Sequence, residues 1–132
     1  GVALEKTGIA RIAADAVASG FNDLGPYAVL ASLYLLAAIL TELISNNAVA
    51  ALLTPIAIGI AISLVVDPRP FVIAVMFASS ASFVTPIGYQ TNTYVYGAGG
   101  YKFADFSKIG LPLAIALWVL ASFLIPILWP FE

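Results

Sequence analysis

The segment that decides the fold is TELISNN, residues 41–47, which places polar side chains between two long apolar runs. The flanking runs, residues 24–41 and 43–66, carry no charged residue. If both runs lie in a bilayer, the Ser-Asn-Asn tip at residues 45–47 lies deep within it. Hydroxyl and amide groups at that depth cost free energy unless something binds them. A tight turn at the membrane surface is the alternative, and helical periodicity does not choose between the two.

The composition places the chain among integral membrane proteins. Hydrophobic residues make up 62% of it and charged residues 9%, whereas soluble domains carry about 25% charged residues. Its charge-free runs, residues 24–41, 43–66, 70–101 and 109–131, each approach or exceed the roughly 20 residues that span a bilayer as a helix. We therefore predict an all-α integral membrane fold.

The chain contains no cysteine and no histidine. This excludes disulfides, thiolate chemistry, an imidazole base, and zinc or haem ligation by those residues. Lone hydroxyl groups are all that remains for an enzyme, so we expect no enzymatic activity, no cofactor and no nucleic-acid partner. A net charge of −2 says little, because nearly all charged residues lie near the ends of apolar runs.

Turn and breaker residues divide the chain into segments. Residues 1–23 hold charges that do not fall on one helical face, which favours a short helix at the membrane surface. Prolines in DPRP, residues 67–70, break any helix there. The opening GVALEKTG resembles the middle of an element, so we expect a piece of a longer protein. Lys102 and Lys108 predict that the loop at residues 98–108 is cytoplasmic.

A second polar break, TPIGYQTNT at residues 85–93, interrupts another charge-free run. The apolar stretch before it, residues 71–84, is helical in pattern but too short to span a bilayer. Broken helices within membranes are tolerated where the freed backbone is buried in protein or lines a cavity. We interpret the two polar breaks as one binding site, and a proline kink without a ligand is the alternative. The small residues at 78–82 favour close helix packing over ligand binding.

The chemistry of the tip suits two kinds of ligand. A helix that ends at Ile44 presents its negative end there, and the hydroxyls of Thr41 and Ser45 with freed carbonyls suit a small hard cation. A helix that begins near Asn47 presents its positive end, and its backbone N–H groups with the Asn46 and Asn47 amides suit a carboxylate or sulfate oxygen. Ion and substrate sites on discontinuous helices are typical of secondary transporters.

Glu42 is the charged residue of the tip. An unpaired carboxylate in a bilayer costs at least about 2.5–3.5 kcal/mol, so it is protonated, paired or facing water. Three roles stay open: structural hydrogen bonding, shaping of the cation site, and proton transfer.

Three motifs carry a family resemblance. TELISNNA at residues 41–48, TPIGYQTN at 85–92 and GGYKFADF at 99–106, in this order, resemble the divalent anion/sodium symporter family. That family includes sodium/dicarboxylate, citrate and sulfate permeases. The resemblance covers nearly the whole chain and corresponds to the C-terminal part of the family's second inverted repeat.

The resemblance implies an architecture and a mechanism. Residues 1–23 would be an interfacial arm helix, 26–66 a re-entrant hairpin, 71–97 a broken helix and 108–129 the last transmembrane helix. The implied function is secondary active transport of a divalent anion (dicarboxylate, citrate or sulfate) coupled to sodium, by an elevator movement. The implied full-length protein is a homodimer and a multi-pass protein of the cell membrane. A non-coupled channel or a structural membrane subunit, in which the breaks are only kinks, is the competing class.

The resemblance also implies site residues. The residues implied for sodium are Thr41, Ser45, Asn46, Thr85 and Gly88. Those implied for the substrate are Ser45, Asn46, Asn47, Thr85, Pro86 and Asn92. Asn47 stands where the family usually has threonine, and we expect substrate choice to depend on it.

Overall fold

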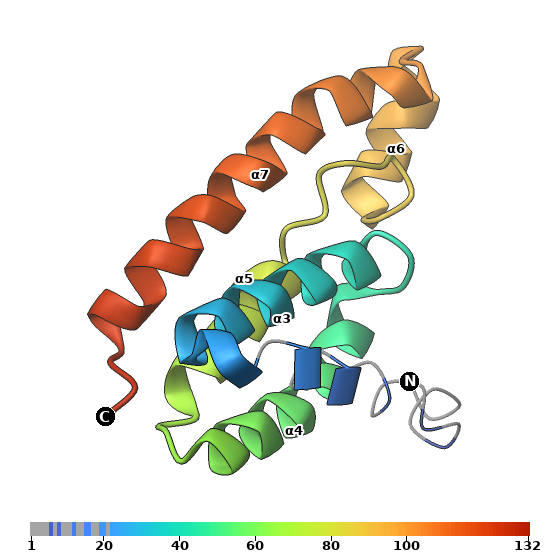
Figure 1. The fold of residues 1–132 in the computed structure, drawn as a ribbon. Coiled ribbons are helices and arrows are strands. Elements are labelled where there is room, and N and C mark those ends of the chain that lie inside the picture. Colours follow the sequence, from blue (N-terminus) through green and yellow to red (C-terminus); the bar gives the residue numbers. More distant parts are fainter. Residues whose placement is uncertain (1–5, 7, 9–11, 13–14, 17–18, 21) are drawn as a thin grey trace.

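The structure, a computed structural model, describes residues 6, 8, 12, 15–16, 19–20 and 22–132. Every regular element in this part of the chain is helical (Figure 1). The elements are the 3-10 turn η1 (Asn22–Leu24) and helices α3 (Pro26–Thr41), α4 (Asn46–Leu64), α5 (Arg69–Ser79), α6 (Gln90–Gly99) and α7 (Phe103–Leu128). The prediction of an all-helical fold is confirmed for these residues. The predicted surface helix at residues 1–23 falls largely outside them.

Helices α3 and α4 form a hairpin with a short tip. Gly25, at φ 83°, and Pro26 in the first turn set the start of α3, since only glycine adopts positive φ without strain. The N–H of Glu42 bonds the carbonyl of Ile39 at 3.2 Å and that of Leu43 bonds Leu40 at 3.0 Å. These i→i−3 bonds tighten the last turn, so α3 ends at Thr41, before the expected Ile44.

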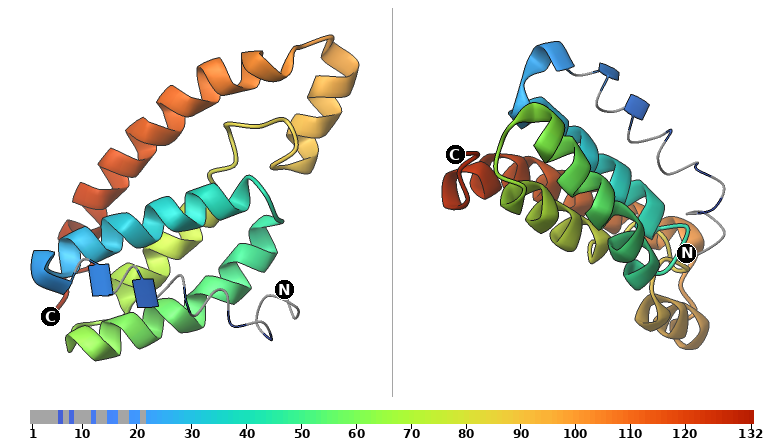
Figure 2. Two further views of the ribbon diagram at one scale, coloured as in Figure 1. Left: turned by 45° about the vertical axis from the view of Figure 1, so that its right-hand side comes forward. Right: turned by 90° about the horizontal axis from the view of Figure 1, so that it is seen from below.

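Helix α5 packs against both α3 and α4, and α7 crosses α3 and α5 (Figure 2). The fully buried side chains come mainly from α3, α4 and α5, among them Leu30, Leu33, Leu53, Phe71 and Val75. Because lipid is as apolar as these side chains, van der Waals contact holds such helices together within a bilayer. Buried alanines such as Ala37, Ala57 and Ala78 allow the close approach that this contact needs.

Helix α5 ends at Ser79, earlier than the expected Val84. The hydroxyls of Ser79 and Ser80 both bond the carbonyl of Met76, at 3.0 and 3.1 Å. Serine side chains that bond nearby carbonyls compete with the helical ladder. The chain then runs without regular structure through residues 80–89, here called the break, before α6 begins at Gln90.

Helix α7 begins at Phe103, before the expected residue 108, because Asp105 caps it. The Asp105 carboxylate accepts a bond of 2.8 Å from the Lys102 N–H, which satisfies an orphan donor at the helix start. Further along, Trp118 Nε1 donates to the Ala31 carbonyl at 2.9 Å. This bond fixes α7 to the middle of α3.

Two helices meet the length and hydropathy of a membrane span within the described residues. They are α4, with 19 residues, and α7, with 26. Helices α3 and α5 are apolar but shorter. The 16 residues of α3 reach about 24 Å at 1.5 Å per residue, less than the roughly 30 Å of bilayer hydrocarbon. By length and composition, these apolar helices are consistent with the membrane protein that the composition predicts.

Candidate functional site

The tip of the hairpin lies between Thr41, the last residue of α3, and Asn46, the first of α4. Ser45 is the N-cap of α4. Its Oγ accepts a bond of 3.3 Å from the Ala48 N–H, and its carbonyl accepts one of 3.0 Å from the Val49 N–H. The cap holds the tip in the geometry that starts the helix. The positive end of α4 is therefore directed toward the tip.

Thr41, Asn46, Ser79 and Ser82 bring five oxygen atoms together, here called the oxygen cluster. Thr41 Oγ1 lies 2.6 Å from Asn46 Oδ1, 2.6 Å from the Ser79 carbonyl oxygen and 3.2 Å from Ser82 Oγ. Ser82 Oγ lies 2.8 Å from Asn46 Oδ1 and 3.3 Å from the Thr41 carbonyl oxygen. Thr41 has no exposed surface, and Ser79 and Ser82 are 4% exposed. Thr41, Ser79 and Ser82 therefore shield their part of the cluster from solvent.

The oxygen cluster has more close contacts than protons. Five oxygen–oxygen contacts are formed, but only the two hydroxyls carry a hydrogen to donate. The Asn46 amide turns its oxygen toward both hydroxyls and not its NH₂ group. Thr41 and Ser79 are also the last residues of α3 and α5, so two negative helix ends meet here. The cluster is chemically suited to a small hard cation.

Glu42 joins the tip to the break. One carboxylate oxygen accepts the Val84 N–H at 2.9 Å. The other accepts the Thr85 N–H at 3.0 Å and the Thr85 hydroxyl at 2.8 Å. Thr85 Oγ1 in turn accepts the Gly88 N–H at 3.1 Å. Of the three roles left open for Glu42, structural hydrogen bonding is the one that this geometry displays.

Side chains from α6 and α7 bond three backbone carbonyls of the break. Asn92 Nδ2 donates to the Ser82 carbonyl at 2.8 Å, and Thr93 Oγ1 donates to the Pro86 carbonyl at 2.8 Å. From α7, Ser107 Oγ donates to the Val84 carbonyl at 3.0 Å. An irregular segment in a membrane needs such partners, because lipid supplies none.

An open cavity of about 610 Å³ lies between the tip and residues 87–93. This volume falls within the range of about 300–1,000 Å³ typical of small-molecule sites. No charged side chain lines it in the described part of the chain. Its polar walls are hydroxyl and amide side chains: Ser45, Asn46, Asn47, Ser80, Tyr89, Gln90 and Thr93. The cavity is therefore a neutral, polar site beside the start of α4.

The structure separates the predicted site residues into three groups. Asn46 belongs to both the oxygen cluster and the cavity wall, whereas Thr41 belongs to the cluster. Ser45 and Asn47 line the cavity, and so does Gly88 from the break. The remaining predicted residues do not line the cavity. Thr85 and Asn92 bond groups that hold the backbone of the break, and the Pro86 carbonyl accepts a bond from Thr93.

The small-residue pattern at 78–82 predicts helix packing and no ligand role for the serines at 79, 80 and 82. The Ser79 carbonyl and the Ser82 hydroxyl belong to the oxygen cluster, and Ser80 lines the cavity. Ala78 and Ser79 are buried, so the segment also packs between helices as its sequence predicts. The available signal was the crowding of serines just before a helix break.

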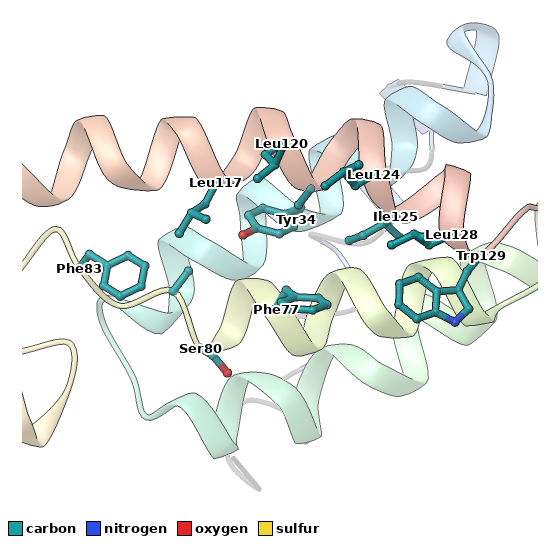
Figure 3. A pocket seen from close by; sticks show the side chains of 12 residues that line it. Tyr34, Phe77, Ser80, Phe83, Leu117, Leu120, Leu124, Ile125, Leu128 and Trp129 are labelled. Carbon is teal, nitrogen blue, oxygen red and sulfur yellow. The ribbon is translucent and has the colours of Figure 1, made fainter.

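A separate apolar cavity of about 320 Å³ lies among α3, α5 and α7 (Figure 3). Leu117, Leu120 and Leu124 of α7 face Phe77 of α5 across it, and the Tyr34 ring from α3 lies between the helices. Its walls offer almost no hydrogen-bonding groups, so it is unsuited to an ion or a dianion.

Comparison with known proteins gives a consistent set of relatives. The family model described as citrate transporter matches residues 1–131. An uncharacterized transporter of Synechocystis sp. is 45% identical over 129 residues, which are 98% of this chain and 21% of that protein. An uncharacterized transporter of Escherichia coli, YfbS, is 40% identical over 130 residues, which are 98% of this chain and 21% of that protein.

A relative with a named cargo is sodium/sulfate cotransporter 1 of Chlamydomonas reinhardtii. It is 40% identical over 124 residues, covering 93% of this chain and 14% of that protein. The chain thus spans about a fifth or less of the length of these curated relatives. No solved structure gives a significant match. Because the family model covers almost every residue, the chain belongs to the citrate transporter family.

Proposed function

We propose that the chain is part of a secondary transporter that carries a small divalent anion together with sodium. The observation that carries the proposal is the position of the oxygen cluster, which shares Asn46 with the neutral polar cavity. Relatives named sodium/sulfate cotransporters support sodium and sulfate as the cargo class. The family description supports citrate, and dicarboxylates share the same recognition chemistry.

The oxygen cluster is the proposed sodium site. Thr41 and Asn46 are its predicted members, and the Ser79 carbonyl and Ser82 hydroxyl complete it. Hard cations take oxygen ligands such as these. Sodium there would relieve the contact between oxygens that lack protons, and it would supply a positive charge that the cavity wall does not provide.

The polar cavity is the proposed anion site. Ser45, Asn46 and Asn47 provide hydroxyl and amide groups at the start of α4, where the helix end favours anionic oxygens. Tyr89 and Gln90 line the same cavity at the start of α6. A re-entrant hairpin, an elevator movement, a homodimer and a multi-pass location in the cell membrane complete the proposal, on the strength of the family alone.

The test is uptake by the full-length protein in proteoliposomes. Labelled sulfate, succinate and citrate are supplied in turn, with an inward gradient of sodium or of potassium. We expect saturable uptake of one of these anions that requires sodium. Uptake that is equal in both salts would favour the non-coupled channel, and no uptake of any of the three would contradict the cargo class.

A further inference from the structure

Glu42 is a carboxylate in an apolar region of the chain, where a charge costs free energy unless hydrogen bonds compensate it. Glu42 lines an apolar cavity of about 280 Å³ whose walls include Leu35, Ile39 and Trp118. In the described part of the chain no lysine or arginine lies within ion-pairing distance of it. Its hydrogen-bond donors are the Val84 and Thr85 groups of the break.

Gly88 lies close to the same carboxylate. A Cβ at this position would lie 2.6 Å from Glu42 Oε2 and 3.3 Å from Ser82 Cβ. Gly88 also lines the polar cavity, and its N–H bonds Thr85 Oγ1. The Thr85 hydroxyl therefore connects the Glu42 carboxylate to Gly88 in the cavity wall.

Thr41 and Glu42 are consecutive residues that contact the two ends of the segment at residues 79–85. Thr41 contacts the Ser79 carbonyl and the Ser82 hydroxyl within the oxygen cluster. Glu42 binds the N–H groups of Val84 and Thr85. One peptide unit and residues 79–88 therefore connect the oxygen cluster to the cavity wall.

We propose that Glu42 is a positioning residue that locks the break onto the hairpin tip, so that cation binding at the oxygen cluster orders the Gly88 wall of the anion cavity. The proposal rests on the proposed sodium-coupled function. It adds a route of coupling between the two sites that involves no direct contact of Glu42 with either ligand. The carboxylate accepts three hydrogen bonds from the break, and charge-assisted bonds of this kind are about twice as strong as neutral ones.

The test variant is Glu42→Gln in the full-length protein. Glutamine keeps the shape but replaces one accepting oxygen with an NH₂ donor, which then faces N–H groups of the break. We expect the KM for the transported anion to rise by about tenfold. We also expect added sodium to lower that KM by much less than in the wild type, while kcat at saturating sodium and anion changes little.

Thr85→Val tests the same contacts from the other side, since it removes the hydroxyl between Glu42 and Gly88. The double variant should show less than the sum of the two single effects. Thr54→Val is the matched control, because that hydroxyl bonds the Ala50 carbonyl within its own helix. It should leave both the KM and its dependence on sodium unchanged.

A measurement that does not depend on transport tests the Glu42 contacts even if the protein carries none of the three anions. Ile87→Cys places a thiol in the exposed part of the break, and its labelling by a maleimide reports the order of that segment. Glu42→Gln should speed labelling by about tenfold and abolish any slowing by sodium. Equal labelling rates with and without Glu42 would overturn the proposal, whatever the wild type transports. If the wild type transports an anion and Glu42→Gln has the same KM for it, that result would overturn the proposal as well.

Discussion

Replacing Thr41 with valine tests the sodium assignment most directly, because valine keeps the shape and removes the hydroxyl. Thr41 Oγ1 lies 2.6 Å from Asn46 Oδ1 and 2.6 Å from the Ser79 carbonyl, on a residue with no exposed surface. An interaction of a neutral polar group with a charge contributes about 1.5–3 kcal/mol. Loss of this ligand should raise the sodium concentration at half-maximal uptake by roughly 10- to 150-fold.

Two measurements check this prediction. The first is the sodium dependence of anion uptake into proteoliposomes. The second is the rise in melting temperature that sodium causes in detergent. Sodium at 100 times its Kd stabilises the folded state by about 2.7 kcal/mol, and a tenfold weaker Kd reduces that to about 1.4 kcal/mol.

The controls separate ligand loss from misfolding. Thr41→Val leaves the buried Ser79 carbonyl without its donor, which costs about 1–3 kcal/mol of stability on its own. Thr41→Ser keeps the oxygen and should restore sodium affinity to near the wild-type value. If folded Thr41→Val protein is half-saturated at the wild-type sodium concentration, the oxygen cluster does not bind sodium and the reasoning fails.

Three further predictions concern the parts that hold the site together. A Cβ at Gly110 would overlap the Phe83 carbonyl, so Gly110→Ala should lower the free energy of unfolding by about 1–3 kcal/mol, measured by thermal unfolding. Gly97→Ala is the control, because a Cβ there meets nothing within 4 Å and should cause no loss of stability through packing. Ser45→Ala removes the α4 cap, so we expect a loss of about 1 kcal/mol together with loss of uptake, and normal uptake would exclude Ser45 from the anion site. Trp118→Phe removes the bond to the Ala31 carbonyl and should lower stability by about 1 kcal/mol while the KM for the anion stays at the wild-type value.

The two polar breaks could be identified from sequence because each interrupts an apolar run. Amides and hydroxyls at residues 45–47 and 85–93 have no reason to lie there unless they bond to each other or to a ligand. The structure brings the two segments together: Glu42 binds Thr85, and both segments line one cavity. Local composition was therefore sufficient to predict which segments meet.

The pairing of individual atoms could not be predicted in this way. The Ser82 hydroxyl meets Asn46 across 36 positions of sequence, and nothing local distinguishes that serine from one that packs between helices. For a similar reason, the sequence predicts an end of α5 that is later than the observed Ser79. Pro86 predicts that the helix is interrupted, but not where. The helix ends where the serine hydroxyls bond the Met76 carbonyl and where Thr41 and Glu42 bond the chain that follows.

The arrangement of helix ends gives a physical reason for the proposed coupling, because no charged side chain among the described residues lines the polar cavity. The C-terminal ends of α3 and α5 meet at the oxygen cluster, while the N-terminal ends of α4 and α6 border the cavity. Partial charges at helix ends contribute about 0.3–1 kcal/mol each, too little alone to hold a dianion away from water. If the cluster binds sodium, the full positive charge beside Asn46 adds what the helix ends lack. By linkage the anion would then favour sodium binding by the same factor, which is the coupling of binding that the proposed cotransport needs.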